Sequence, residues 1–455
     1  MTNALWSDAG FLNGFERVHG DFTVIVVRRF LMACQVSHKW LEFNRMLAAN
    51  ARLPRVWRLR DREGRGGSQR LMPRIAIYRH QLFKISEPFI TDQAGRLEGC
   101  DVVYLGRERF GPAPPGSESH ALSDVPAQRS RRARLWQIAT RDPRPYLRLV
   151  DGHAPDLLHA HFGVEGVYAM PIAARLQIPL VTTFHGFDAT LTRRALLRST
   201  HPSWWNYVLH RRELAGRGDL FICVSEYIRK RLIALRFPEA RTVVHYIGVD
   251  LDSIRPAQAR SATPTIVHIA RLVEKKGTRH LIAAFAQLRR KCPDAQLQIV
   301  GDGPLEGALR DQAQCLGVAD AVRFLGARPH AQALELLSRA WLLSLPSVTD
   351  RAGELEGLGM VLLEAAACAV PVVATWHNGI PEVVVDGVTG YLCAERDEDA
   401  LAERLLELLR DESLRDRMGR AARHRAEQHF DLARQSAALA GRYAGLLRAS
   451  HPGPV

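Results

Sequence analysis

The chain of 455 residues contains only seven cysteines, and no two of them form a Cys-x-x-Cys pair. An odd, scattered set fits buried thiols in a reducing cytosol better than a disulfide framework or a zinc site. The sequence also lacks any apolar run of the about eighteen residues that a membrane-spanning helix needs. The short apolar run at 22–30 has no convincing signal-peptide cleavage site after it. We therefore expect a cytoplasmic protein without a membrane span.

Motifs of two other classes of protein are missing as well. A nicotinamide-dependent dehydrogenase needs G-x-G-x-x-G between a strand and a helix, but Gly301-Asp-Gly303 is followed by Pro-Leu-Glu. No recognised nucleic-acid-binding motif accompanies the formal net charge of +14. That charge favours an anionic partner such as a nucleotide or a phospholipid surface, or it reflects a general preference for arginine. We expect no nucleic-acid partner.

The residues that are present predict an α/β protein. Hydrophobic residues make up 47% of the chain and charged residues 24%, which is ordinary for a folded domain. Short apolar runs alternate with longer amphipathic stretches, and this alternation predicts a parallel, doubly wound sheet. The segment 110–126, rich in Pro, Gly and Ser, interrupts the pattern and is interpreted as a mobile loop. The expected strands of the first domain are Ile75–Tyr78, Val102–Leu105, Leu157–Ala160, Leu180–Phe184, Leu220–Val224 and Thr242–Ile247.

The segment from Glu356 to Glu364 is the most informative one for function. Two glycines between the glutamates let backbone approach a ligand closely, and the run Met360–Cys368 predicts a helix whose N-terminus attracts phosphate. Glu364 can accept hydrogen bonds from the vicinal hydroxyls of a ribose, and Glu356 can reach a second polar group of the same ligand. Such a site suits a nucleotide sugar. The alternative is that both glutamates are ordinary exposed residues.

Basic residues follow a predicted strand upstream of this segment. The run Ile266–Arg271 is typical of a buried strand, and Lys276 lies in the loop after it. Open α/β sheets bind ligands at the carboxyl ends of their strands, so Arg271 and Lys276 could hold a diphosphate there and stabilise it as a leaving group. Downstream, a strand is expected over Val370–Thr375, and the segment 378–390 is interpreted as a turn, a short strand and another turn.

Together these residues resemble the retaining, family 4 glycosyltransferases, whose GT-B fold has two Rossmann-like parallel-sheet domains facing a cleft. The resemblance covers nearly all of residues 264–430. It implies that Arg271 and Lys276 bind the donor diphosphate and that Glu364 binds the ribose. It also implies that the transferred sugar contacts Glu356 and the backbone of Gly357, Leu358, Gly359 and Met360. The matching pieces are Ala270-Arg-Leu-Val-Glu-Lys-Lys-Gly, Val300-Gly-Asp-Gly-Pro, Phe324-Leu-Gly, Leu345-Pro-Ser, the glutamate pair and Gly379-Ile-Pro-Glu.

A looser match covers the first half of the chain. The segments 73–90, 157–163 and 180–188 resemble the bacterial exopolysaccharide and colanic-acid biosynthesis subgroup. This resemblance implies that His185 contacts the donor sugar near the reacting carbon, and the alternative is a histidine that caps a loop. We expect His159 and His161 on opposite faces of their strand, with His161 toward the cleft.

The acceptor is expected to bind on the first domain. Besides His161, we assign Ser86, Glu87 and Asp188 to its site, although Glu87 could instead cap the helix that follows it. His185, Glu356, Arg271 and Lys276 form the expected catalytic set. Asp250-Leu-Asp252 has the spacing of a metal-binding D-x-D but is interpreted as a turn. The nucleotide sugar is a substrate, so we expect no metal and no other cofactor.

The expected domains follow from the strands and the resemblance. Residues 73–253 form the acceptor-binding domain, 254–265 the linker and 266–430 the nucleotide-sugar-binding domain, and a helix at 431–455 crosses back to the first domain. Residues 1–72 are a basic extension. We hypothesise that Met72 is the natural start, and the competing interpretation is a basic tail that touches membrane.

The sequence thus predicts transfer of a sugar from a UDP- or GDP-sugar to a lipid-linked saccharide in exopolysaccharide or lipopolysaccharide biosynthesis. The basic, aromatic stretches 129–138 and 141–148 predict peripheral contact with the anionic inner face of the cell membrane, and a solvated helix face is the alternative. Two further alternatives remain. One is a soluble acceptor, as in enzymes of the sucrose-synthase type, and the other is a nucleotide-sugar epimerase on the same fold.

Overall fold

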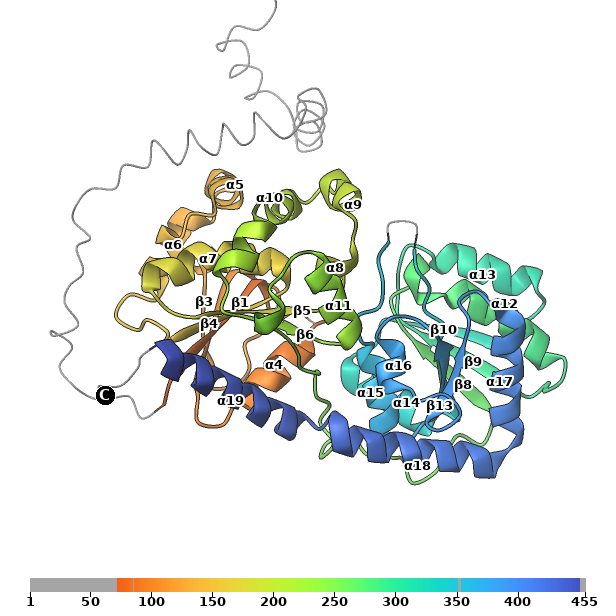
Figure 1. Cartoon of the computed structure of the whole chain (residues 1–455). Coiled ribbons are helices and arrows are strands. Elements are labelled where there is room, and N and C mark those ends of the chain that lie inside the picture. The colour runs from red at the N-terminus through yellow and green to blue at the C-terminus, as the bar shows by residue number, and fades with distance from the viewer. Residues whose placement is uncertain (1–71, 85, 351–352, 451–455) are drawn as a thin grey trace, which may run out of the picture.

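The computed structural model describes residues 72–84, 86–350 and 353–450. Residues 1–71 of the basic extension, on which the proposal that the protein starts at Met72 depends, lie outside this part. Two parallel-sheet domains lie side by side, and the last helices run beneath both of them (Figure 1). The predicted fold class, two Rossmann-like domains in one chain, is confirmed.

The first domain contains a seven-stranded sheet in the order β3-β2-β1-β4-β5-β6-β7. Every neighbouring pair is parallel, so the carboxyl ends of all seven strands lie at the same edge. The strands are β1 (Arg74–Leu82), β2 (Asp101–Arg109), β3 (Glu118–Ala121), β4 (Leu157–His161), β5 (Leu180–Phe184), β6 (Leu220–Cys223) and β7 (Thr242–Val244).

Helices cover both faces of this sheet. Because successive side chains of a strand point to opposite faces, Ala76 and Tyr78 pack on the α7 side, whereas Ile75 and Ile77 pack with α4 and the last helix. Figure 1 shows α5, α6, α7 and α10 above the sheet and α4 below it. The helices are α4 (Pro88–Gly95), α5 (Arg131–Thr140), α6 (Arg144–Leu149), α7 (Gly163–Leu176), α8 (Phe187–Thr190), α9 (Arg193–Arg198), α10 (Pro202–Arg217) and α11 (Glu226–Ala234).

The second domain repeats this plan with a six-stranded parallel sheet in the order β10-β9-β8-β11-β12-β13. Its strands are β8 (Thr265–Ile269), β9 (Gln296–Val300), β10 (Val322–Gly326), β11 (Leu342–Leu345), β12 (Val372–Thr375) and β13 (Gly390–Cys393). Its helices are α12 (Thr278–Arg289), α13 (Glu306–Cys315), α14 (His330–Arg339), α15 (Met360–Ala367), α16 (Ile380–Val383) and α17 (Glu398–Arg410).

The chain returns to the first domain at its C-terminal end. Helix α18 (Glu412–His429) lies along the second domain and α19 (Leu432–Ser450) along the first. Between them, Asp431 pairs with Val249 in an isolated bridge. Helix α19 is anchored deep in the first domain, because the hydroxyl of Tyr443 lies 2.6 Å from Nδ1 of the buried His159.

Two local expectations are wrong. The segment 110–126 contains β3, which pairs with β2, and a 3-10 turn at Leu122–Asp124, so it is not one irregular loop. The expected short strand after Asn378 is the helix α16. Its β-branched residues favour a strand, but Pro381 in the first turn has a backbone angle suited to starting a helix, and this local preference prevails.

Candidate active site

The glycine-containing segment before α15 forms a loop, which we call the donor loop (residues 354–359), against the first domain. A Cβ atom at Gly357 would overlap the carbonyl oxygen of His185, so only glycine permits this approach. Gly359 precedes the helix with a φ of 85°, a left-handed conformation that favours glycine. The two glycines therefore place the N-terminus of α15 beside the loop that follows β5.

Lys276 and Glu356, the expected diphosphate and sugar ligands, form an ion pair with each other. Next to them, Lys275 pairs with Glu354 at 2.5 Å. Burial alone would raise the pKa of Glu356, but the two lysines outweigh it and hold that pKa below its usual value. Glu356 is therefore ionised at neutral pH. An incoming phosphate would have to share the cation of Lys276 with Glu356.

A histidine that the sequence analysis did not single out supports this loop. Nε2 of His377 accepts a hydrogen bond from the backbone N–H of Glu356 at 3.3 Å, and Nδ1 lies 2.6 Å from Glu395. Burial lowers the pKa of His377, although Glu395 opposes that shift. The ring is thus neutral, with its proton on Nδ1. His377 and Glu395 follow β12 and β13, which are neighbours, and only a predicted pairing of these strands could have revealed the contact.

Glu364, the expected ribose ligand, is also paired. Oε1 of Glu364 on α15 lies 2.8 Å from Nε2 of His330, which begins α14. The hydrogen bond to Glu364 raises the pKa of His330, and Asp92 on α4 of the first domain adds to this shift. Glu364 and His330 therefore face the first domain, as a ligand between the two sheets would require.

Arg271 differs from these residues because its side chain is exposed. It follows β8 and forms no side-chain hydrogen bond or ion pair with any other residue that the structure describes. Lys276 lies in the short 3-10 turn Glu274–Lys276 that follows. The two cations thus lie beyond the same strand end, one free to move and one held by Glu356.

The expected sugar contact of the first domain, His185, packs among aromatic rings. Its ring centroid lies 4.5 Å from that of Phe162 and 5.2 Å from that of Phe89. Nε2 lies 3.1 Å from Nδ1 of His161, whereas Nδ1 is buried without a hydrogen-bond partner among the described residues. Burial lowers the pKa of His185 well below its usual value, so the ring is neutral.

The expectation for His159 and His161 is wrong. Residues two apart in a strand point to the same face, and these two rings stack with their centroids 4.4 Å apart. His159 lies deeper, held by Tyr443 and by Thr183 at 2.7 Å. His161 is itself buried behind His185, so neither histidine presents its ring directly to an acceptor.

Asp188 also proves to have a structural position. It is 1% exposed, and its two carboxylate oxygens accept hydrogen bonds from the backbone N–H groups of Gly163 and Gly186 at 2.8 and 2.9 Å. The carboxylate thereby fixes the turn after His185 to the start of α7. The expected contact with an acceptor does not fit these bonds, because both oxygens are already used inside the domain.

Glu87 is tied into the first domain as well. Arg79 of β1 donates hydrogen bonds of 2.8–3.0 Å to both of its oxygens, and Lys84 lies 3.5 Å away. Glu87 occupies the position before α4, but its side chain makes no capping bond, so the alternative of a helix cap is wrong. Ser86 beside it is exposed.

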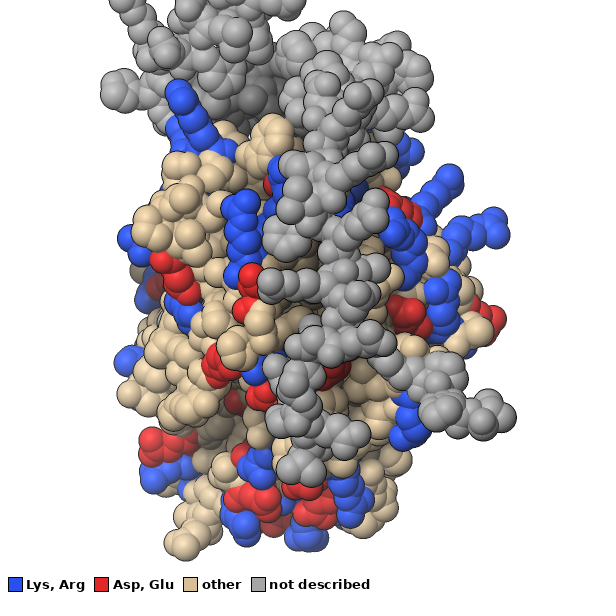
Figure 2. All heavy atoms as spheres, turned by 90° about the vertical axis from the view of Figure 1, so that its left-hand side faces the viewer, with Lys and Arg blue, Asp and Glu red and all other residues tan. Residues whose placement is uncertain are grey.

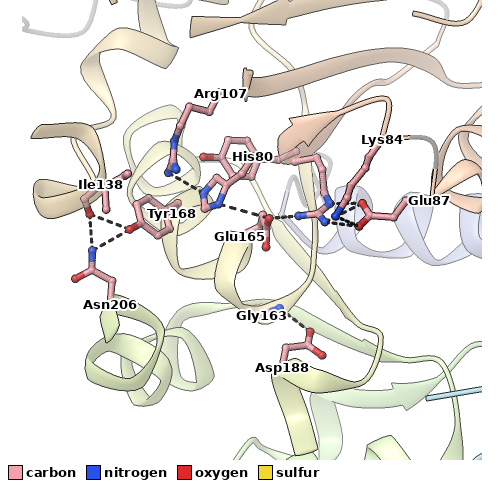
Figure 3. Close-up of polar contacts among 12 residues, drawn as sticks. His80, Lys84, Glu87, Arg107, Ile138, Gly163, Glu165, Tyr168, Asp188 and Asn206 are labelled. Atoms are coloured by element: carbon pink, nitrogen blue, oxygen red, sulfur yellow. Dashed lines mark hydrogen bonds and ion pairs between the residues drawn. The ribbon is translucent and has the colours of Figure 1, made fainter. Parts of the chain in front are cut away.

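Figure 3 shows that this pair is the outer end of a chain of buried ionisable groups. Arg79 also pairs with the buried Glu165 of α7, whose Oε1 lies 3.4 Å from Nδ1 of His80. His80 in turn lies 3.1 Å from a guanidinium nitrogen of Arg107. Burial raises the pKa of Glu165 to about 7, although Arg79 opposes the shift.

A cavity of about 300 Å³ opens beside Arg79 and Glu87. It lies at the carboxyl end of β1, and Arg79 connects it to His185, because its guanidinium carbon lies 4.2 Å from the centroid of the Phe162 ring that packs on His185. Apolar residues make up most of its wall. They include Leu82, Phe83, Tyr104 and the run Pro112-Ala-Pro-Pro115.

Within the described part of the chain, no cluster of three or more His, Cys, Asp or Glu side chains could hold a metal ion. Asp250 of the D-x-D segment accepts hydrogen bonds from the backbone N–H groups of Asp252 and Ser253, at 3.0 and 3.1 Å, and so forms a turn. The same described residues include no helix that combines the length and apolar character needed to cross a bilayer.

Two parallel-sheet domains that meet at a glycine-containing loop before a helix define the class of GT-B glycosyltransferases. Comparisons with known proteins identify the family. The model for "Glycosyl transferases group 1" matches residues 252–425, and the model for "Glycosyltransferase Family 4" matches residues 93–253. A GDP-mannose-dependent alpha-(1-6)-phosphatidylinositol monomannoside mannosyltransferase of Mycolicibacterium smegmatis is 34% identical over 307 residues, which cover 64% of this chain and 77% of that protein. The chain belongs to the family 4, group 1 glycosyltransferases.

Relatives from polysaccharide biosynthesis match as well. A protein of Escherichia coli K12 named for colanic acid biosynthesis is 35% identical over 254 residues, which cover 55% of this chain and 60% of that protein. Among solved structures, Anabaena HepE in complex with UDP and glucose superposes with a TM-score of 0.66 at 21% identity, over 82% of this chain and all of that one. The latter likeness shows the fold alone.

Proposed function

We propose that the protein is a retaining glycosyltransferase that takes a UDP- or GDP-sugar as donor. The observation that carries this proposal is the arrangement around α15, where Lys276–Glu356 and His330–Glu364 flank a glycine-lined helix N-terminus. The helix N-terminus and Lys276 suit a diphosphate, Glu364 suits a ribose, and Glu356 suits the hydroxyls of a sugar. Each glutamate lies in an ion pair, and a ligand can take the place of one partner in that pair.

In the proposed reaction, the bond between the anomeric carbon and the diphosphate oxygen breaks and its electron pair remains on the phosphate. Arg271, Lys276 and the N–H groups that begin α15 stabilise the growing negative charge. The acceptor hydroxyl forms the new bond on the same face of the sugar, and the departing phosphate takes its proton. Closure of the domains excludes water and so limits hydrolysis of the donor.

His185 is proposed to contact the donor sugar from the first domain. Its carbonyl already touches the donor loop, because Gly357 packs directly against it. Its ring nitrogens point to His161 and into the protein, so binding of the sugar requires the ring to turn toward the donor loop. The unpartnered Nδ1 supports this role, since a buried nitrogen without a hydrogen bond lowers the cost of that rotation.

The proposed acceptor is a lipid-linked saccharide of exopolysaccharide or lipopolysaccharide biosynthesis. The cavity beside Glu87 supports it, because this cavity connects to His185 through Arg79 and Phe162 and combines an apolar wall with Lys84. The relatives named for colanic acid biosynthesis and as a phosphatidylinositol monomannoside mannosyltransferase support the same choice. Ser86 and Lys84 lie beside the opening of this cavity and would contact the acceptor there.

Helix α5 is proposed to rest on an anionic membrane. Leu135 and Trp136 are each 48% exposed, and α5 also carries Arg131, Arg132 and Arg134. Figure 2 shows Lys and Arg side chains gathered on the upper part of the side of the first domain that faces away from the second. The neighbouring Tyr146, grouped with this surface in the sequence analysis, is fully buried and takes no part.

A transfer assay tests the proposal. The purified protein is incubated with UDP- or GDP-sugars and with polyprenyl-diphosphate-linked saccharides in anionic vesicles. We expect release of nucleoside diphosphate that depends on the acceptor, and a product whose glycosidic bond keeps the donor's anomeric configuration by NMR. Transfer to soluble sugars alone, without vesicle binding, would contradict the lipid-linked acceptor. Conversion of the donor sugar without any acceptor would indicate an epimerase instead.

A further inference from the structure

The glutamate of Gly379-Ile-Pro-Glu joins the two domains directly. Glu382 belongs to α16 of the second domain, yet its carboxylate accepts hydrogen bonds from the backbone N–H groups of Glu226, at 2.8 Å, and Tyr227, at 3.1 Å, in the first domain. The hydroxyl of Tyr246, also in the first domain, donates a third at 3.0 Å. Figure 1 shows α11 and α16 next to the boundary between the domains.

These bonds complete a helix of the other domain. The first N–H groups of a helix have no partner within it, and its N-terminus carries a partial positive charge. In α11, the hydroxyl of Ser225 accepts a hydrogen bond from the N–H of Ile228 at 3.3 Å. The N–H groups of Glu226 and Tyr227 then have no partner within the helix. Glu382 satisfies both. A charged cap is thus supplied to the first domain by the second.

The short helix that carries Glu382 is itself held in place. Arg425 of α18 donates hydrogen bonds to the carbonyl oxygens of Glu382, at 2.6 Å, and Val383, at 3.2 Å. Tyr246 on the other side packs against Phe430, with ring centroids 5.1 Å apart, where the chain crosses back between the domains. The contact therefore lies at the pivot about which the domains would open.

Contacts also connect this pivot to the donor loop. A Cβ atom at Gly379 would overlap the carbonyl oxygen of Gly357 and lie 3.2 Å from Cβ of Ser225. Gly357 in turn packs on the carbonyl of His185. The start of α11, the start of α16, the donor loop and the turn at His185 thus form one continuous set of close contacts, so a shift at the pivot moves the donor loop relative to His185.

We propose that Glu382 is a positioning residue that sets the alignment of the two domains for sugar transfer. The inference rests on the proposed function but adds a residue that touches neither donor nor acceptor. Donor nucleotide binds on the second domain, so its affinity does not depend on this alignment. The chemical step does, because groups from both domains must meet, and a misplacement of about 1 Å can lower the rate of such a step about 10²-fold.

Steady-state kinetics and calorimetry on four full-length proteins test this inference. They are the wild type, Glu382→Ala, Tyr246→Phe and the control Glu226→Gln, whose side chain pairs with Arg229 at 3.1 Å while its backbone N–H stays in place. We expect kcat to fall about 10²-fold in Glu382→Ala and roughly three- to tenfold in Tyr246→Phe, which loses one of three bonds. The Kd for nucleoside diphosphate stays within about threefold, and Glu226→Gln matches the wild type.

Hydrogen exchange provides a readout that needs no turnover. In Glu382→Ala, the amides of Glu226 and Tyr227 exchange faster than in the wild type, while those in the middle of α11 do not. An unchanged kcat in folded Glu382→Ala, or an equal loss of nucleotide affinity, would overturn the proposal. If that variant does not fold, Tyr246→Phe decides by the same two criteria. A wild type that binds no nucleotide would overturn the proposed function, whereas the exchange rates would still test the contact itself.

Discussion

The two domains share one architecture but use their charged residues differently. In the second domain, Lys276–Glu356 and His330–Glu364 pair around the donor loop and helix α15. In the first domain, Glu87, Arg79 and Glu165 pair in a chain that leads from the cavity beside Glu87 into the domain. A ligand can take the place of one partner in the first kind of pair. In the second kind, both partners hold the fold.

This difference explains why functional residues were easier to predict from the sequence in the second domain than in the first. Residues that bind a nucleotide sugar follow fixed spacings, so the segment from Glu356 to Glu364 stands out without a structure. Buried charges have no such spacing, because their partners come from distant strands and helices. In the first domain, Asp188 looked like a ligand, but its oxygens accept hydrogen bonds from two backbone N–H groups inside the domain. Glu87 is held by Arg79 and also lines the cavity proposed for the acceptor.

The largest expected effect concerns the ion pairs Glu87–Arg79 and Arg79–Glu165, which we call the inner chain. Arg79→Ala leaves Glu165 and Glu87 without their shared cation, and breaking a buried pair in this way costs about 3–5 kcal/mol. Arg109, half-exposed and paired with Asp124 at 2.8 Å, is the control, and its replacement by alanine should cost less than about 1 kcal/mol. Urea unfolding measures both. Equal losses would contradict a structural role for the inner chain.

The next effect concerns the donor side and catalysis rather than stability. Lys276→Ala should lower kcat/KM roughly 10²- to 10³-fold, because one cation at the leaving diphosphate is lost. Lys275→Ala removes a neighbouring cation that pairs with Glu354, and its effect should stay below about tenfold. A Lys276→Ala protein that is fully active but unstable would show that Lys276 supports the fold rather than the donor site.

A third effect appears in the dependence of stability on pH. The pKa of Glu165 lies near 7 in the folded protein and lower in the unfolded chain, so the folded state binds the extra proton. Stability should therefore fall as pH rises, by about 2 kcal/mol between about pH 5.5 and 8. Glu165→Gln should flatten this decline in urea unfolding. An equally steep decline in the variant would place the titrating group elsewhere.

The smallest effect concerns the Glu364–His330 pair at the proposed ribose site. The pKa of His330 is raised by Glu364, so the pair is strongest below the ordinary histidine pKa and is lost as pH rises through the raised value. Nucleotide that needs Glu364 should thus bind more weakly at about pH 6 than at about pH 8, by up to roughly fivefold for a half-exposed pair. His330→Gln should abolish this dependence in calorimetric titrations. A steeper dependence in the variant would contradict competition for Glu364.

Particular elements show how far the sequence could predict the fold. Alternating apolar runs gave six strands of the first sheet, because parallel strands buried on both faces are almost wholly hydrophobic. The strand β3, Glu118–Ala121, was missed because it is short, polar and at the sheet edge. Helix α16 was taken for a strand because its β-branched residues favour strands, whereas Pro381 in its first turn favours the start of a helix.

The same limit applies to the site. Glu356, Glu364 and Lys276 could be found because glycines and an apolar run mark the surrounding loop and helix. His377 could not, since its role depends on Glu395 beyond the next strand and on a backbone N–H of the donor loop. The inward position of Asp188 likewise depends on the start of α7, which follows a different strand.

Calorimetric titration of UDP, GDP and ADP, with EDTA present, tests the central claim most directly. The proteins are the wild type, Glu364→Ala and the control Glu335→Ala. The control removes an exposed glutamate of the neighbouring α14 whose one ion pair among the described residues is with Arg339, at 3.7 Å. We predict that the wild type binds one nucleotide selectively without metal, that Glu364→Ala weakens this binding about tenfold or more, and that Glu335→Ala leaves it unchanged. Failure of all three nucleotides to bind the folded wild type, or equal binding by Glu364→Ala, would contradict the proposed donor site.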